Sequence, residues 1–221
     1  MTIASSTIRS TFLMILAVIV HMTLQCAAYS TEVRQREKVV LFLGDSLTSG
    51  YGVEEAQTYP ARIQRKINSN RLNYKTINAG ISGDTSSGAL RRTDWLLKEP
   101  VDVLVLAIGT NDGLRGIPME ATEKNLEMII DKVKAKNSQV KIIVAGMLIP
   151  PTMGRKYTDS FKEVFPRVAK KNGAKLIPFL LEGVAGEPSL NLPDGIHPTA
   201  EAYEKVADNV WAVLRPMIDK N

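Results

Sequence analysis

Short apolar runs alternate along this chain with longer stretches in which apolar residues recur every three or four positions. The strongest run covers residues 101–108 (VDVLVLAI) and is apolar nearly throughout, which is typical of a strand buried on both faces. Four other short runs carry the same signal. They predict further strands at residues 38–43, 74–78, 140–145 and 175–177.

Helical spacing fills the stretches between these runs. Leu126, Ile129, Ile130 and Val133 form an i, i+3, i+4, i+7 stripe, which predicts an amphipathic helix over about residues 119–136. Similar spacing predicts four more helices: from about residue 59 after Thr58, over 85–97, over 157–171, and after Pro198-Thr199 to Met217. Since strands and helices alternate five times, we expect right-handed crossovers and a parallel sheet covered by helices on both faces.

Composition narrows the class of protein. The chain has 221 residues, of which 44% are hydrophobic and 23% charged, and this suits one globular domain rather than a disordered chain. The formal net charge is +5, but the two signs are interspersed and no block of five like charges occurs. The basic balance therefore indicates solubility, and no nucleic-acid partner is expected.

The N-terminal segment has the layout of a secretory signal. A polar start with Arg9 precedes an apolar run at residues 11–20, and Cys26-Ala27-Ala28 supplies small residues for cleavage. We therefore expect a cleaved signal peptide at residues 1–28, one domain at residues 29–221, and a periplasmic or secreted protein. A retained anchor is the alternative, although the run is short for a membrane span, which needs ~20 apolar residues, and no stable span is expected after cleavage.

Cleavage would limit the available chemistry. It removes the single cysteine and His21, which leaves His197 as the last imidazole. A disulfide and a cysteine nucleophile are then excluded, and a zinc site built from Cys and His is nearly excluded. Any imidazole chemistry must use His197.

Polar, glycine-rich segments follow three of the predicted strands, and a fourth polar segment precedes the last helix. In open parallel sheets, ligands bind beyond the carboxyl ends of the strands, so we expect these segments to converge. They are GDSL at 44–47, GISGD at 80–84, GTND at 109–112 and DGIHP at 194–198.

Ser46, Asp194 and His197 are the residues in these segments that could support nucleophilic catalysis. A serine hydroxyl needs a base to take its proton, and His197 is the imidazole available. Asp194 lies three residues earlier and could orient that ring. Taken singly, Ser46 could be a helix cap and Asp194 a turn residue. Their joint placement with His197 favours catalysis.

Acyl transfer also needs donors for the oxyanion that develops during the reaction. Three candidates occur in the converging segments: the backbone N–H of Ser46, the backbone N–H of Gly83 and the side-chain amide of Asn111. Gly83 could instead be a turn glycine, and Asn111 a residue that braces its loop.

The four segments, in this order, resemble the four sequence blocks of the SGNH/GDSL hydrolase superfamily. The longer stretches GDSLTSGYGV, GTNDGLRG and LPDGIHP are similar to the bacterial secreted subfamily of acyl-CoA thioesterase I, protease I, lysophospholipase L1 and arylesterase. The resemblance implies a flavodoxin-like three-layer α/β/α sandwich with a five-stranded parallel sheet, and hydrolysis through an acyl-serine intermediate. It also implies that Asp45 braces the nucleophile loop.

The resemblance further implies a role for each matching residue. Ser46 would be the nucleophile, His197 the general base and acid, and Asp194 its orienting partner. Ser46, Gly83 and Asn111 would form the oxyanion hole. The resemblance implies neither a metal nor an organic cofactor.

Two apolar loop segments suggest where an acyl chain could bind. In the resembling subfamily, the loop that corresponds to residues 113–118 lines the acyl groove, and here it contains Leu114, Ile117 and Pro118. Ile149 lies in a second apolar segment, MLIPP. Burial of an acyl chain would gain ~0.8 kcal/mol per CH₂. Alternatively, both segments simply pack on the domain.

The expected substrates are small acyl esters, thioesters or lysophospholipids. One alternative is a carbohydrate O-acetyl esterase on the same scaffold. It would need aromatic groups to stack on sugar, and aromatic residues make up 6% of the chain. Another alternative is a binding protein without activity, against which the complete Ser, His and Asp set argues.

Overall fold

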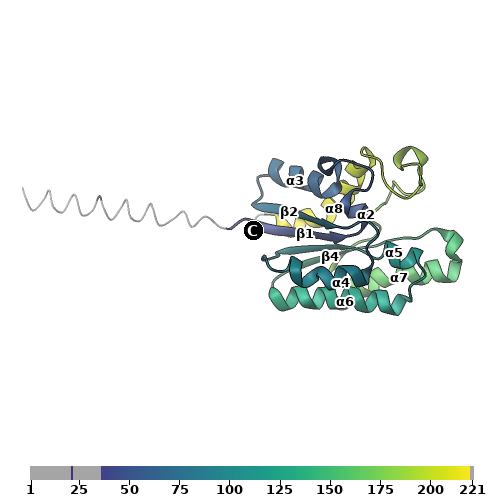
Figure 1. Cartoon of the computed structure of the whole chain (residues 1–221). Helices are drawn as coiled ribbons and strands as arrows, with labels where there is room; N and C mark the ends of the chain where they lie inside the picture. The colour runs from purple at the N-terminus through teal and green to yellow at the C-terminus, as the bar shows by residue number, and fades with distance from the viewer. Residues whose placement is uncertain (1–20, 22–35, 220–221) are drawn as a thin grey trace, which may run out of the picture. The chain divides into compact units, whose positions relative to one another are not determined.

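The computed structural model of the chain describes residue 21 and residues 36–219, and the part from Glu37 onwards forms one compact unit. The expected signal peptide and its cleavage site lie outside these residues, except for His21. Five strands form one parallel sheet in the order β2-β1-β3-β4-β5 (Figure 1). They are β1 (Lys38–Gly44), β2 (Tyr74–Gly80), β3 (Val103–Ala107), β4 (Lys141–Ala145) and β5 (Lys175–Ile177).

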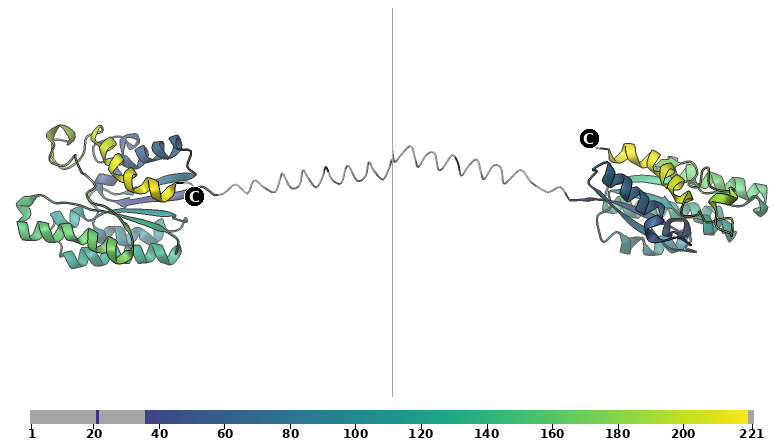
Figure 2. Two further views of the ribbon diagram at one scale, coloured as in Figure 1. Left: turned by 180° about the vertical axis from the view of Figure 1, so that it is seen from behind. Right: turned by 90° about the horizontal axis from the view of Figure 1, so that it is seen from above.

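Helices cover both faces of this sheet, as Figures 1 and 2 show. On one face lie α3 (Tyr59–Ser69) and α8 (Ala202–Ile218), and on the other α4 (Ser86–Leu96), α6 (Met119–Lys136) and α7 (Arg155–Asn172). The flavodoxin-like three-layer fold expected from the sequence is therefore confirmed, because this strand order belongs to that fold.

Shorter helices occupy several of the connections. Two of them follow strand ends directly: α2 (Ser46–Ser49) after β1 and α5 (Thr110–Leu114) after β3. Three 3₁₀ turns lie in other loops, at η1 (Glu55–Gln57), η2 (Pro151–Met153) and η3 (Pro188–Leu190). Within the described residues, no helix has both the length and the apolarity to cross a membrane.

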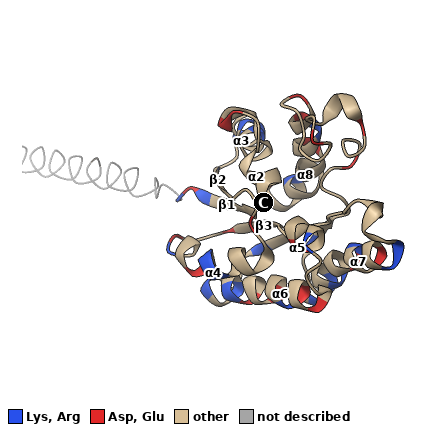
Figure 3. Ribbon diagram, turned by 45° about the vertical axis from the view of Figure 1, so that its right-hand side comes forward, with Lys and Arg blue, Asp and Glu red and all other residues tan. Residues whose placement is uncertain are grey.

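The hydrophobic core consists mainly of side chains from β1, β3 and the buried sides of the amphipathic helices. Every residue of β3 is buried, and β1 is buried after Lys38, as a sheet covered on both faces requires. The stripe of α6 faces the sheet, with Leu126, Ile129 and Ile130 fully buried. Charged residues of both signs occur along α6 and α7 (Figure 3).

The register of β2, β1 and β3 brings the carboxyl ends of these three strands to one edge of the sheet. Gly44 at the end of β1 pairs with Gly80 on β2 and with Ala107 on β3. A Cβ atom at Gly44 would lie 2.0 Å from Thr48 Oγ1 and 2.6 Å from the Ala107 carbonyl oxygen. Glycine is therefore needed here for α2 to pack directly on the sheet edge, and this packing fixes where Ser46 lies.

Candidate active site

Ser46 is the first residue of α2, immediately beyond β1. The buried Asp45 caps this turn, because its Oδ1 accepts a hydrogen bond from the Leu47 amide at 3.1 Å. The hydroxyl of Tyr203 on α8 donates to the Leu47 carbonyl oxygen at 3.0 Å. Gly50 ends the turn with φ 83°, a left-handed conformation that glycine adopts without steric cost. The serine is thus held from both sides of its short helix.

A chain of two hydrogen bonds joins Ser46, His197 and Asp194. His197 Nε2 lies 2.8 Å from Ser46 Oγ, and His197 Nδ1 lies 2.7 Å from Asp194 Oδ2. An ionised carboxylate can only accept, so Nδ1 of the neutral ring carries the proton and Nε2 accepts from the serine hydroxyl. The structure therefore brings together three residues that the sequence separates by up to 151 positions.

Asp194 is held ionised by its own loop. Partial burial alone would raise its pKa, but the amides of His197 and Ile196, together with the imidazole, outweigh burial and lower the pKa to about 2. Its Oδ1 accepts from these amides at 3.0 and 2.9 Å. The same contacts hold the imidazole, because Asp194 and His197 belong to one tight turn.

Gly83 lies in the loop after β2, and Asn111 is the second residue of α5. Gly83 has φ 77°, and its carbonyl oxygen accepts from Arg115 Nη2 at 2.9 Å. Asn111 Nδ2 donates one hydrogen to the Asp84 carbonyl oxygen at 3.0 Å, which leaves its second N–H for another acceptor. Within residues 36–219, the amides of Ser46 and Gly83 donate to no protein acceptor.

An apolar cavity of about 390 Å³ adjoins the serine turn. Two of the residues predicted to bind substrate, Leu114 and Ile149, line it, together with Leu47 from α2. This volume lies within the range of small-molecule sites. The rest of the lining comes from four loops: Thr110, Met147, Leu148, Pro150, Pro151, Phe179, Leu181, Ala185, Gly186, Gly195 and Ile196.

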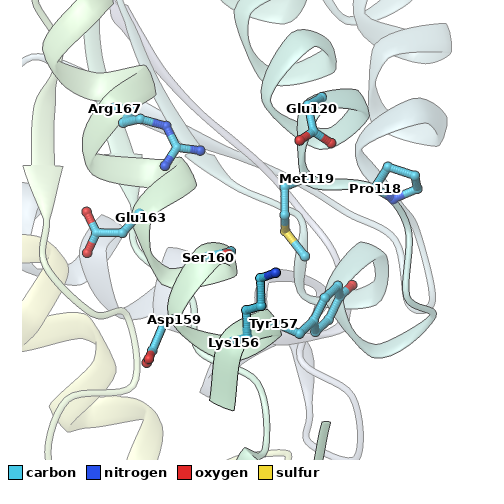
Figure 4. Close-up of a pocket in the computed structure, with 9 residues that line it drawn as sticks. All are labelled: Pro118, Met119, Glu120, Lys156, Tyr157, Asp159, Ser160, Glu163 and Arg167. Carbon is cyan, nitrogen blue, oxygen red and sulfur yellow. The ribbon is translucent and has the colours of Figure 1, made fainter. Parts of the chain in front are cut away.

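The other two residues predicted to bind substrate lie away from this cavity. Pro118 lines a second, larger cavity of about 710 Å³ between the start of α6 and α7 (Figure 4). Ile117 is half-buried, and its carbonyl oxygen accepts from the Tyr157 hydroxyl at 3.3 Å. That hydroxyl also lies 3.0 Å from the Gly113 carbonyl oxygen, so Tyr157 ties the loop to α7.

The sequence analysis did not select several residues that lie near the site. The Tyr51 ring lies 4.5 Å from the His197 ring and is tilted by 39° to it, so it covers one face of the imidazole. Phe179 and Leu181 follow β5 and complete the cavity wall. Their apolar run directly after a strand end was the available clue. The contact of Arg115 with Gly83 had none.

A serine, an imidazole and a carboxylate in one hydrogen-bonded chain, at the carboxyl edge of a flavodoxin-like sheet, are the arrangement of a serine hydrolase. The described residues contain no group of three or more His, Cys, Asp or Glu side chains that could hold a metal ion. The sequence profile of the GDSL-like Lipase/Acylhydrolase family matches residues 42–205. The chain belongs to this family and is a GDSL-type hydrolase.

Named relatives cover most of the chain. It is 36% identical over 182 residues to esterase TesA of Pseudomonas aeruginosa, and the aligned region covers 82% of this chain and 90% of that protein. It is also 36% identical to thioesterase 1/protease 1/lysophospholipase L1 of Escherichia coli K12, over 81% of this chain and 85% of that protein. The crystal structure of psychrotrophic esterase EstA from Pseudoalteromonas sp. superposes with a TM-score of 0.77 at 30% identity. The match covers 83% of this chain and all of EstA.

Proposed function

We propose that this protein hydrolyses small acyl esters or thioesters through an acyl-serine intermediate, with Ser46 as the nucleophile. The observation that carries the proposal is the chain of hydrogen bonds from Ser46 Oγ through the His197 ring to Asp194, at 2.8 and 2.7 Å. Both distances lie within the range for proton transfer between a nucleophile and its base.

In the first half of the reaction, Ser46 Oγ attacks the acyl carbonyl carbon while His197 Nε2 takes the hydroxyl proton. The imidazolium that forms is stabilised by Asp194, which keeps its negative charge. When the tetrahedral intermediate collapses, the bond to the leaving group breaks and Nε2 gives its proton to the departing oxygen or sulfur. In the second half, water attacks the acyl carbon while His197 Nε2 takes a proton from it. The bond between the acyl carbon and Ser46 Oγ then breaks, Nε2 returns the proton to Oγ, and the carboxylic acid leaves.

The negative charge on the tetrahedral intermediate needs donors that are already in place. The amides of Ser46 and Gly83 and the second N–H of Asn111 supply three such donors, and no acceptor within residues 36–219 occupies any of them. Loss of one donor of this kind costs about 10²–10³ in kcat in a known serine hydrolase. We therefore assign Ser46, Gly83 and Asn111 to the oxyanion hole.

The cavity beside α2 is the proposed site of the acyl chain. Leu47, Leu114 and Ile149 give it an apolar wall close to the nucleophile, which suits an alkyl chain better than a sugar. The substrate class is therefore an acyl ester, a thioester or a lysophospholipid, in agreement with the names of the relatives. No feature of the cavity favours a carbohydrate O-acetyl ester.

The decisive variant is Ser46→Ala, with Ser87→Ala on the exposed start of α4 as the matched control. We expect Ser46→Ala to fold normally and to lose p-nitrophenyl ester hydrolysis by several orders of magnitude, because triad residues act as a unit. The control should retain wild-type rates. Since the related EstA is inhibited by monoethylphosphonate, a phosphonate probe should also label Ser46, as tryptic mass spectrometry would show. Near wild-type activity in Ser46→Ala would refute the nucleophile.

The signal layout of residues 1–28 leads us to propose that the enzyme is exported and cleaved before residue 29. Expression of the full chain in a Gram-negative host, followed by intact-mass analysis of the periplasmic fraction, tests this. A mass that retains residues 1–28 would show that the segment stays attached as an anchor.

A further inference from the structure

Arg92 on α4 uses all three of its guanidinium nitrogens at the carboxyl edge of the sheet. Its Nε donates to Asp84 Oδ2 at 2.8 Å, Nη1 to the Ala79 carbonyl oxygen at 2.7 Å, and Nη2 to the Gly44 carbonyl oxygen at 3.0 Å. The side chain is 17% exposed and that of Asp84 is 12% exposed, so water screens this ion pair little. One planar group thus connects the end of β1, the end of β2 and the loop that follows β2.

The acceptors of Arg92 lie next to the proposed oxyanion donors. Gly44 precedes Ser46 by two residues, and Asp84 directly follows Gly83. The Asp84 carbonyl oxygen also accepts the hydrogen bond from Asn111 Nδ2 at 3.0 Å. The three donors therefore come from three segments: α2, the loop after β2, and α5. Arg92 contacts Gly44, which lies two residues before Ser46, and it contacts Asp84, whose carbonyl oxygen accepts from Asn111.

We propose that Arg92 is a positioning residue that holds the three oxyanion donors in register without touching the substrate. The proposal rests on the function proposed above, since it concerns the same site. Rigid, pre-oriented donors are worth most when the loops that carry them cannot relax, and a displacement of about 1 Å can cost on the order of 10²-fold in rate. The guanidinium suits this task because its donors diverge in a fixed plane, whereas a lysine provides one nitrogen.

The fold has other means of holding this region together. β1 and β2 are paired along their whole length, from Lys38 with Tyr74 to Gly44 with Gly80. The Gly44 carbonyl oxygen also accepts from the Ile81 amide at 3.1 Å and keeps this partner without Arg92. Loss of the guanidinium should therefore leave the sheet intact and remove the contact of Arg92 with Asp84 Oδ2. Asp84 Oδ1 would keep the hydrogen bond from the Thr85 amide at 3.0 Å, so the loop that carries Gly83 would be held less firmly.

The test compares Arg92→Met and Arg92→Lys with Arg91→Met as the matched control. Arg91 is the exposed neighbour on the same helix, and its Nη1 donates to Ser87 Oγ at 3.0 Å, away from the site. With a p-nitrophenyl ester, we expect kcat to fall about 10- to 100-fold in Arg92→Met, with KM changed less than about twofold. Arg92→Lys should lose nearly as much kcat with a melting temperature closer to wild type. Arg91→Met should match wild type.

A double-variant comparison separates positioning from general damage to the fold. If Arg92 acts through the oxyanion donors, Arg92→Met should cost a clearly smaller factor in the Asn111→Ala background than in the wild type, because that background has already lost part of the hole. The same factor in both backgrounds would overturn the proposal, as would wild-type kcat in both Arg92 variants. Neither result touches the nucleophile assignment, which fails only if Ser46→Ala remains active.

Discussion

Asp45 gives the sharpest physical prediction, because its carboxyl group is fully buried at the nucleophile turn and pairs with no cation among residues 36–219. Burial raises its pKa from 3.8 to about 7, against the lowering effect of the Leu47 amide and the Thr110 hydroxyl, while the carboxylates of Asp112 and Asp84 raise it further. Asparagine can accept the same hydrogen bond from Leu47 without an ionisable group. Asp45→Asn therefore isolates the cost of the charge.

The size and sign of the effect follow from proton linkage. Below about pH 4 the carboxyl is protonated in the folded and unfolded states, so its titration costs nothing. Between pH 3.8 and about 7 the folded state retains a proton that the unfolded state has lost. Wild-type stability then falls by about 1.4 kcal/mol per pH unit from this group. Over the whole interval the loss is about 4 kcal/mol, and Asp45→Asn should escape it.

Urea unfolding followed by circular dichroism at pH 4, 5, 6, 7 and 8 measures this difference. The free energy of unfolding of Asp45→Asn, minus that of wild type, should rise from pH 4 to about pH 7 and level off between pH 7 and 8. Asp94→Asn serves as the matched control, because Asp94 is exposed on α4 and pairs with Lys132. If the curves of Asp45→Asn and wild type run parallel from pH 4 to 8, the reasoning on burial is wrong.

Three further outcomes follow from packing. Gly44→Ala should lower the free energy of unfolding by about 1–3 kcal/mol in urea and reduce ester hydrolysis, because the added Cβ would collide with Thr48 Oγ1. Wild-type stability of this variant would contradict the prediction. Phe161→Ala should cost about 3–5 kcal/mol, read as a lower urea midpoint, since this ring is fully buried in the core; a loss below about 1 kcal/mol would contradict it. Leu181→Ala should lower the octanoyl-to-acetyl ratio of kcat/KM, because each buried methylene is worth about 0.8 kcal/mol, or about fourfold. Leu96→Ala on α4 is its control, and an equal ratio in both variants would place the acyl chain elsewhere.

Strong periodicity in the sequence predicted the elements that bury most apolar surface. The helix expected at residues 119–136 agrees with α6 at both ends, since its stripe is continuous. The strand expected at 74–78 runs on to Gly80 because Ala79 and Gly80 continue the ladder beside β1, and glycine carries no strand preference of its own. The helices α2 and α5 were not predicted, because four or five residues are too few to show a helical period.

Some residues of the candidate site could likewise be predicted from the sequence, and others could not. Chemistry limits which residue types can form a nucleophile, a base and its partner, and one imidazole in residues 29–221 left a single solution for His197. Parallel topology then predicted that these segments meet at one edge, and in the structure Ser46 Oγ lies 2.8 Å from His197 Nε2. Neither the limits of chemistry nor the parallel topology predicts where Pro118 lies, because an apolar loop residue can line either cavity. In the structure, Pro118 lines the cavity between α6 and α7, where Tyr157 also lies.

Arg92 and the raised pKa of Asp45 had no signal in the sequence, although the resemblance to the superfamily implied that Asp45 braces the nucleophile loop. An arginine within a helix that also contains Arg91 has no local feature to mark it, since what distinguishes the two is the direction of each side chain. Asp45 lies beside the nucleophile, yet the shift of its pKa depends on its burial and on groups from α2, α5 and the loop after β2. Both features depend on which groups surround a side chain in three dimensions, so this sequence predicts candidate reacting groups and one bracing residue but neither Arg92 nor the raised pKa of Asp45.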